Sequence, residues 1–167
     1  MDYAIRPERP EDVAIIREVT TAAFAMAEHS SGTEGAIVDA LRAAGALRIS
    51  LVATEEDQVV GHVAFSPVTL DGADIGWYGL GPVSVRPDLH GLGLGAALIS
   101  AGLERLEKLG AKGCVVLGDP AYYRRFGFRQ DPAIHYQGVP PEYFMALSLD
   151  GSKANGEVAY HSGFSAS

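Results

Sequence analysis

The chain has 167 residues and a formal net charge of −8, with 47% hydrophobic and 20% charged residues. This length and composition indicate one soluble globular domain over residues 1–167. The acidic charge argues against a general nucleic-acid binder and against adsorption to an anionic membrane, because both need a basic surface. No apolar run is long enough to span a bilayer, no secretory signal begins the chain, and the single cysteine suits a reducing compartment. We therefore expect a cytoplasmic protein.

The first half of the chain alternates helix and strand signals. Pro10, followed by two acidic residues, predicts the start of a helix whose apolar residues recur at helical spacing. The other elements expected here are a short strand over 3–6, a helix over 33–44, and strands over 49–54, 59–67 and 75–85.

The second half contains the clearest amphipathic pattern, a helix over residues 94–109 with leucine and isoleucine on one face. A buried strand over 114–117 follows, and then a short helix that opens at Asp119 and ends at Gly127. Two final strands are expected over 143–149 and 157–160. This order of elements predicts a mixed sheet with helices on both faces.

Basic residues concentrate in one part of the chain. Residues 81–129 hold seven basic and four acidic residues, a net +3, which leaves −11 for the remainder. A locally basic segment in an acidic protein is the part expected to receive a small anion.

The same segment contains a glycine-rich turn between a strand and the amphipathic helix. Gly91, Gly93 and Gly95 lack the Cβ atoms that would keep an anion from the backbone. The free N–H groups of the first helical turn would then form a phosphate cradle. The alternative is a tight turn that needs glycine only for its geometry. A nucleotide P-loop is excluded because no Gly-Lys-Ser/Thr occurs, and the glycine spacing does not fit a dinucleotide fingerprint.

The glycine run resembles the acetyl-CoA pyrophosphate loop of the GCN5-related N-acetyltransferase (GNAT) family, Gln/Arg-x-x-Gly-x-Gly/Ala. Here it reads His90-Gly91-Leu92-Gly93-Leu94-Gly95, with histidine at the first position. Whether His90 donates to a phosphate or is a solvated turn residue stays open. Downstream, Tyr123 to Phe128 is similar to the family's Tyr-x-x-x-Gly-Phe. The stretches 61–67, 118–128 and 139–147 resemble the YhbS-like branch, so the resemblance covers roughly residues 3–149.

The resemblance implies an α/β GNAT fold, with a central mixed, mostly antiparallel sheet of about seven strands that is splayed in the middle. It implies acetyl-CoA as cofactor, CoA as product, and transfer of the acetyl group to a primary amine of a small molecule or peptide by direct attack in a ternary complex. The cofactor-binding residues that it implies are Val83, Ser84, Val85, His90, Gly91, Leu92, Gly93, Leu94, Gly95 and Ala96.

Tyr123 is the candidate catalytic residue. A tyrosine keeps its proton at neutral pH and can give it to the departing thiolate as a general acid. The alternative is that Tyr122 and Tyr123 are core or interface aromatics. By resemblance, the pantetheine arm pairs with the backbone around Val83 and Val85, and the Val83 N–H polarises the thioester carbonyl.

The general base is not assigned: Glu28, His29, Glu34, His62 and a water molecule remain candidates. The histidine spacing gives no support for a metal site. Trp77 and Tyr78 are either acceptor-pocket or ordinary strand aromatics.

Two side chains have simpler interpretations. We expect Asp119 to cap a helix, and Cys114 to be a buried, inert thiol. A non-catalytic acyl-CoA-binding or sensing module is the alternative function, and a homodimer stays open.

Overall fold

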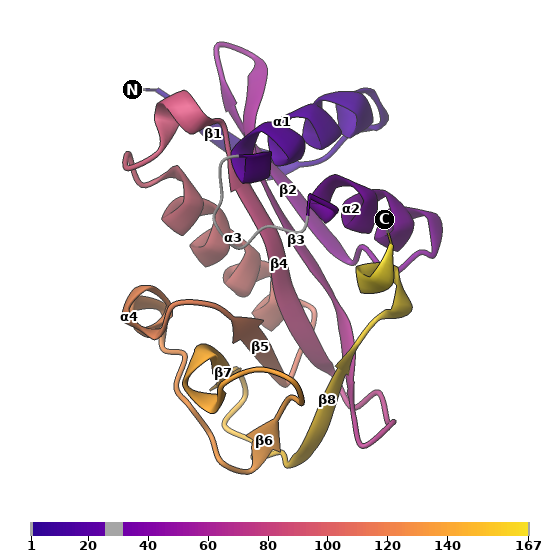
Figure 1. Cartoon of the computed structure of the whole chain (residues 1–167). Helices are drawn as coiled ribbons and strands as arrows, with labels where there is room; N and C mark the ends of the chain where they lie inside the picture. Colours follow the sequence, from indigo (N-terminus) through magenta and orange to yellow (C-terminus); the bar gives the residue numbers. More distant parts are fainter. Residues whose placement is uncertain (1, 26–31, 167) are drawn as a thin grey trace.

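The computed structural model describes residues 2–25 and 32–166, whose path is shown in Figure 1. Its centre is an eight-stranded sheet in the order β1-β2-β3-β4-β5-β7, with β8 pairing with β3 and β6. The described strands are β1 (Ala4–Pro7), β2 (Ile49–Glu55), β3 (Gln58–Leu70), β4 (Trp77–Val85), β5 (Gly113–Leu117), β6 (Ile134–His135), β7 (Phe144–Ser148) and β8 (Gly156–Tyr160). The pairs β4–β5 and β6–β8 are parallel, and the other described pairs are antiparallel.

Helices cover both faces of this sheet. The α-helices of the described residues are α1 (Val13–Ala25), α2 (Glu34–Ala43), α3 (Leu94–Lys108) and the short α4 (Pro120–Tyr123). In Figure 1, α1 and α2 lie on one side of the long central strands and α3 lies on the other. Most of β3 is buried, as expected for a strand with both faces covered. The predicted mixed sheet with helices on both faces is confirmed.

The sheet opens between two of its central strands. Trp77–Gly79 of β4 pair with Gly113–Val115 of β5, and the rest of β4 has no partner on that side among the described strands. β5 continues to pair with β7 as far as Leu117. The splay predicted for the middle of the sheet is therefore present, and it leaves the later half of β4 beside an opening.

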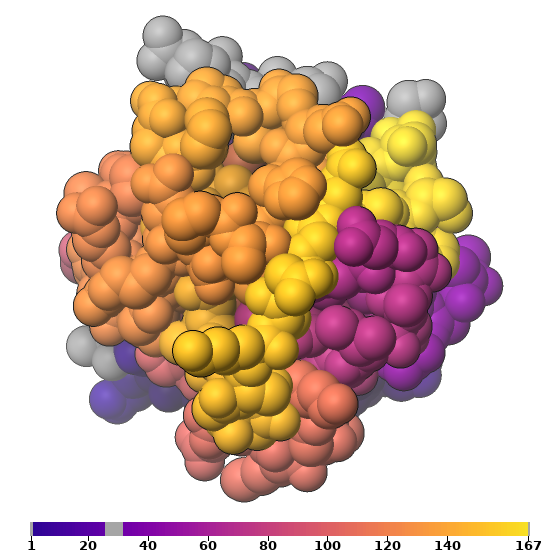
Figure 2. All heavy atoms as spheres, turned by 90° about the horizontal axis from the view of Figure 1, so that it is seen from below, coloured from indigo at the N-terminus to yellow at the C-terminus, as the bar shows by residue number. Residues whose placement is uncertain are grey.

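Several predicted strand bounds were wrong. β3 runs to Leu70 because its last three residues pair with β8. β4 starts at Trp77, since Gly76 adopts a φ of +88° and donates its N–H to Asp74 in a turn. The two-residue β6 was not expected, because so short a strand has no periodicity. In Figure 2 the turn that follows β3 (magenta) lies beside the C-terminal part of the chain (yellow), in agreement with the β3–β8 pairing.

The contact of α3 with the sheet depends on a glycine. A Cβ atom on Gly102 would lie 2.1 Å from Cε1 of Phe65, which is 0% exposed and cannot move into solvent. We expect Gly102→Ala to lower the free energy of unfolding by about 1–3 kcal/mol, the usual cost of overpacking, in spite of alanine's better helix propensity. Urea denaturation measures this. The exposed Ser100→Ala on the same helix is the control, with an expected change of at most about 0.5 kcal/mol. Equal stability of the two variants would contradict the tight packing.

No helix in the described ranges 2–25 and 32–166 is long and apolar enough to cross a membrane.

Candidate active site

A cleft of about 520 Å³ lies where β4 ends and α3 begins. Residues from α1, β4, the glycine-rich turn, the first turn of α3 and the α4 region form its walls. They are Ala23, Phe24, Val83, Ser84, Val85, Leu89, His90, Gly91, Gly93, Leu94, Gly95, Ala96, Tyr122 and Arg125. The cleft thus lies at one end of the opening between β4 and β5.

The glycine-rich turn has the geometry of an anion cradle. Gly91 and Gly93 have φ values of +82° and +86°, which other residues rarely adopt, and nothing lies within 4 Å of a Cβ placed on either. The turn therefore needs these two glycines for its geometry, and it also leaves open space beside them. Because α3 begins at Leu94, the unpaired N–H groups of its first turn are adjacent to that space.

The side chain of His90 is exposed and makes one contact that the sequence did not predict. Its Nε2 lies 2.7 Å from the carbonyl oxygen of Val85, and this geometry requires Nε2–H as the donor. The imidazole thus links the turn to the end of β4.

The backbone of β4 offers hydrogen-bonding groups to the opening. The Arg86 N–H donates to the Val60 carbonyl at 2.8 Å, so Arg86 and Ser84 direct their backbone groups toward β3. Val83 and Val85 alternate with them and direct theirs away from β3, to the side where β5 diverges. An extended ligand could therefore pair with β4 there.

The two adjacent tyrosines have different environments. Tyr122 lines the cleft, and the guanidinium carbon of Arg125 lies 4.3 Å from its ring centroid. Tyr123 does not line the cleft: its ring packs on Phe128, at a centroid distance of 6.0 Å, and against Gly118. Burial raises the pKa of Tyr123 to about 12, with smaller contributions from Tyr122 and Cys114. Tyr123 therefore keeps its proton at neutral pH, as a general acid must.

The structure brings nine of the ten predicted cofactor-binding residues to the cleft. The exception is Leu92, whose side chain is 55% exposed and lies outside the lining. Ser84 is almost fully buried, and its hydroxyl is 3.2 Å from that of Thr20 on α1. Sequence reasoning missed Ala23, Phe24, Leu89, Tyr122 and Arg125 as lining residues. Ala23 and Phe24 of α1 reach the wall of the cleft through tertiary packing, and the sequence has no local signal for such a contact.

The structure describes two of the four side chains considered as the general base. Glu28 and His29 lie outside the described residues. Among the residues that the structure does describe, neither Glu34 nor His62 lines the cleft. His62 is fully buried, and burial lowers its pKa to about 4, so the imidazole is neutral at pH 7. Trp77 is 2% exposed and belongs to the core rather than to a cavity wall.

The remaining sequence predictions concern structural roles. Asp119 accepts a hydrogen bond from the Ala121 N–H at 2.9 Å, so the predicted helix cap is confirmed. Cys114 is fully buried and burial raises the pKa of its thiol, which confirms an inert cysteine. Within residues 2–25 and 32–166, no three His, Cys, Asp or Glu side chains gather as metal ligands.

A splayed mixed sheet with a glycine-rich turn at the start of the central helix is typical of one class of acyltransferases. Sequence comparison leads to the same class. The acetyltransferase (GNAT) domain family matches residues 47–130. The chain also aligns over 96% of its length, at 36% identity, with an uncharacterized N-acetyltransferase of Escherichia coli (strain K12), YhbS, of which it covers 97%. The chain belongs to the GNAT acetyltransferase family.

Solved structures support the same assignment. A GNAT family acetyltransferase from Brucella melitensis, determined in complex with acetyl-CoA, is 53% identical with a TM-score of 0.88, and the match covers 98% of each chain. YhbS from Escherichia coli, determined in complex with CoA, is 35% identical with a TM-score of 0.88, and the match covers 98% of this chain and 92% of that one. These matches extend over almost the whole sheet and its helices.

Proposed function

We propose that the protein is an acetyl-CoA-dependent N-acetyltransferase that acts on a primary amine. The observation that carries this proposal is the cleft at the end of β4, where a turn with two left-handed glycines meets the start of α3 beside unpaired strand edge. Family membership and the cofactors named for the two similar structures give independent support.

The residues of the cleft suit a ligand with phosphates at one end and an extended arm. The N–H groups after Gly93 and the positive end of the α3 dipole would bind the pyrophosphate. The backbone of Val83 and Val85 would hold the pantetheine arm in the opening, as an added strand. Arg125 on the rim supplies a nearby positive charge.

Acetyl-CoA, when bound, supplies an acetyl group activated as a thioester. In the proposed reaction the amine nitrogen forms a bond to the acetyl carbon, and the carbon–sulfur bond breaks. The Val83 N–H would polarise the carbonyl oxygen, and the Tyr123 hydroxyl would protonate the departing thiolate. A base or water removes the proton from the amine.

The test is made in two stages. Calorimetry and thermal unfolding first measure binding; at a ligand concentration about 100 times Kd, we expect the free energy of unfolding to rise by about 2.7 kcal/mol. A panel of primary amines is then screened for CoA thiol release, with the rate without amine as control. Acceleration by any amine supports the transferase.

Two results would contradict the proposal in different ways. If acetyl-CoA binds but no amine in a broad panel accelerates thiol release, the protein is an acyl-CoA-binding or sensing module. If neither acetyl-CoA nor CoA binds at millimolar concentration, the cleft has another ligand.

A further inference from the structure

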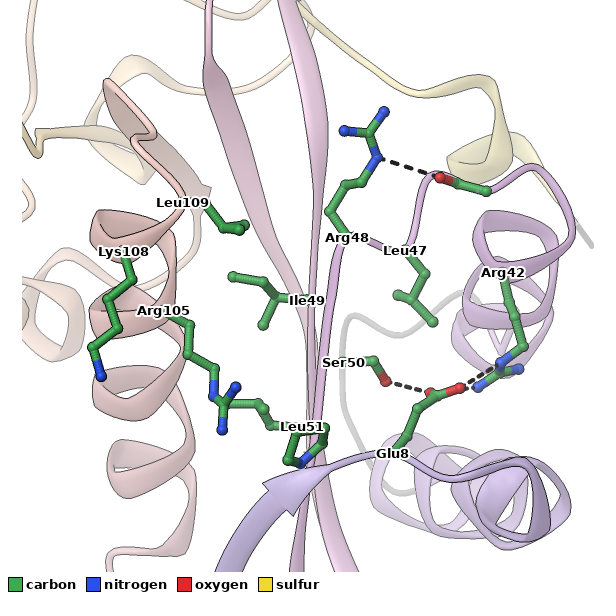
Figure 3. Close-up of a pocket in the computed structure, with 12 residues that line it drawn as sticks. Glu8, Arg42, Leu47, Arg48, Ile49, Ser50, Leu51, Arg105, Lys108 and Leu109 are labelled. Atoms are coloured by element: carbon green, nitrogen blue, oxygen red, sulfur yellow. Dashed lines mark hydrogen bonds and ion pairs between the residues drawn. The ribbon is translucent and has the colours of Figure 1, made fainter.

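A second cavity, of about 460 Å³, lies between the last turn of α3, the start of β2 and the end of α2 (Figure 3). It shares no lining residue with the cleft at the end of β4. Its walls are formed by Pro7, Glu8, Arg42, Gly45, Leu47, Arg48, Ile49, Ser50, Leu51, Arg105, Lys108 and Leu109. The acetyl-transfer proposal uses none of these residues.

One wall of the cavity is a fixed and charge-balanced hydrogen-bond network. Arg42 donates to both carboxylate oxygens of Glu8, at 2.9 Å each, and Ser50 donates to the same carboxylate. Ser50 in turn lies 2.7 Å from Nε2 of the buried His62. Burial alone would raise the pKa of Glu8, but the hydrogen bonds from Arg42 and Ser50 outweigh it and lower the pKa. Glu8 is the one acidic residue among the described lining residues, and Arg42 neutralises it.

The other walls carry three positive charges that are not balanced in this way. Arg105 forms no ion pair with any side chain in residues 2–25 or 32–166, and neither does Arg48. Arg48 donates only its Nε to a backbone carbonyl, that of Gly45 at 3.3 Å, which leaves its terminal nitrogens available. Lys108 lies 3.4 Å from Glu104, but both side chains are largely exposed, and such a pair contributes little.

The position of the charges needs an explanation other than solubility. The whole chain carries −8, so a cavity with an excess of cations departs from the rest of the surface. Arg105 and Lys108 lie in the last turn of α3, where a positive charge stabilises the helix dipole. Arg48 lies on no helix, and Figure 3 shows it and Arg105 on opposite sides of Ile49.

The surface between the cations is apolar. Ile49 and Leu51 are almost completely buried and form the floor, and Leu47 lies beside them. Leu109, predicted from the helical pattern to face the core, is instead 60% exposed at the edge of this cavity, because α3 ends at Lys108. Apolar side chains flanked by a few charged groups are typical of sites for small amphipathic ligands.

We propose that this cavity binds a small molecule with one oxyanion group, carboxylate or phosphate, on an apolar body. The Arg105 guanidinium, which has no ion-pair partner among the described residues, forms charge-assisted hydrogen bonds with the oxyanion, whether carboxylate or phosphate. Arg48, on the opposite side of Ile49, adds a longer-range attraction. The apolar body packs beside Ile49 and covers the exposed Leu109, from which it displaces water.

The test uses four probes at constant ionic strength: hexanoate, hexyl phosphate, neutral hexanol and inorganic phosphate. Backbone amide chemical shifts report each cavity separately, Ile49 and Leu109 for this one and Gly93 for the cleft on β4. We expect saturable shifts at Ile49 and Leu109 with hexanoate or hexyl phosphate, at an affinity at least about tenfold above that of hexanol or phosphate alone. The tighter of the two identifies the oxyanion.

Variants separate a specific site from general attraction of anions. Arg105→Gln should weaken binding of the better probe about tenfold and Arg48→Gln about threefold, whereas Lys153→Gln, which removes one exposed charge elsewhere, should change it less than about twofold. Equal affinity for hexanol and the anionic probes would overturn the proposal. So would equal effects of Lys153→Gln and Arg105→Gln, or shifts confined to Gly93.

Discussion

Gly95→Asp should abolish binding of CoA and acetyl-CoA while the protein stays folded. Gly95 is in the first turn of α3 without a positive φ, and its Cβ would make ordinary contacts, 3.6 Å from Tyr122 Oη and 3.8 Å from Val85 Cγ2. A carboxylate at this end of a helix favours the dipole, so the fold has no reason to weaken. The same carboxylate occupies the expected pyrophosphate site and repels it, and calorimetry should detect a loss of at least about 100-fold in affinity.

Gly95→Ala is the matched control, because it adds the Cβ without the charge. We expect its affinity for CoA to stay within about fivefold of the native value. Should Gly95→Asp bind CoA normally, the turn would be a structural connection only, and the phosphates would have to bind elsewhere.

Tyr123→Phe should slow acetyl transfer about 100-fold with little change in CoA affinity, since a positioned general acid typically contributes at least this factor. The hydroxyl is held in a partly buried ring cluster, and the raised pKa keeps its proton in place at neutral pH. The measurement is kcat with an amine found in the panel, together with Kd for CoA.

Tyr122→Phe, at the neighbouring position, tests whether Tyr123 rather than Tyr122 is the general acid. Tyr122 lines the cleft and its hydroxyl faces the first turn of α3, so its loss should weaken CoA binding modestly and leave kcat largely unchanged. The opposite result, with kcat lost in Tyr122→Phe and retained in Tyr123→Phe, would move the general-acid role to Tyr122.

Much of the fold follows from local patterns. The face of α3 formed by Leu94, Leu98, Ile99, Leu103 and Leu106 is buried as its period predicts. The glycine spacing at 91, 93 and 95 placed the turn that bounds the cleft. These features could be predicted because propensity and periodicity are read within a short window of sequence.

What the sequence did not predict depends on contacts between distant segments. The extension of β3 to Leu70 needs β8, whose paired residues Val158 to Tyr160 lie far later in the chain. Phe24, on α1, and Arg125, in the turn after α4, line the same cleft only because the fold brings these distant segments together. Likewise, the cations of the second cavity come from an α3 end and a β2 start that share no sequence pattern.

The pairing of β4 with β5 extends over three residues of each strand and joins two larger ladders of the sheet. On one side β1 to β4 form a continuous ladder, and on the other β5 pairs along its length with β7. Among the described strands, Trp77–Gly79 and Gly113–Val115 are the only strand residues that pair the two ladders directly, and the Lys112 N–H adds a bond to the Gly76 carbonyl beside them. A molecule bound in the opening beside Val83 and Val85 would contact both ladders, so its binding free energy would also stabilise their relative position.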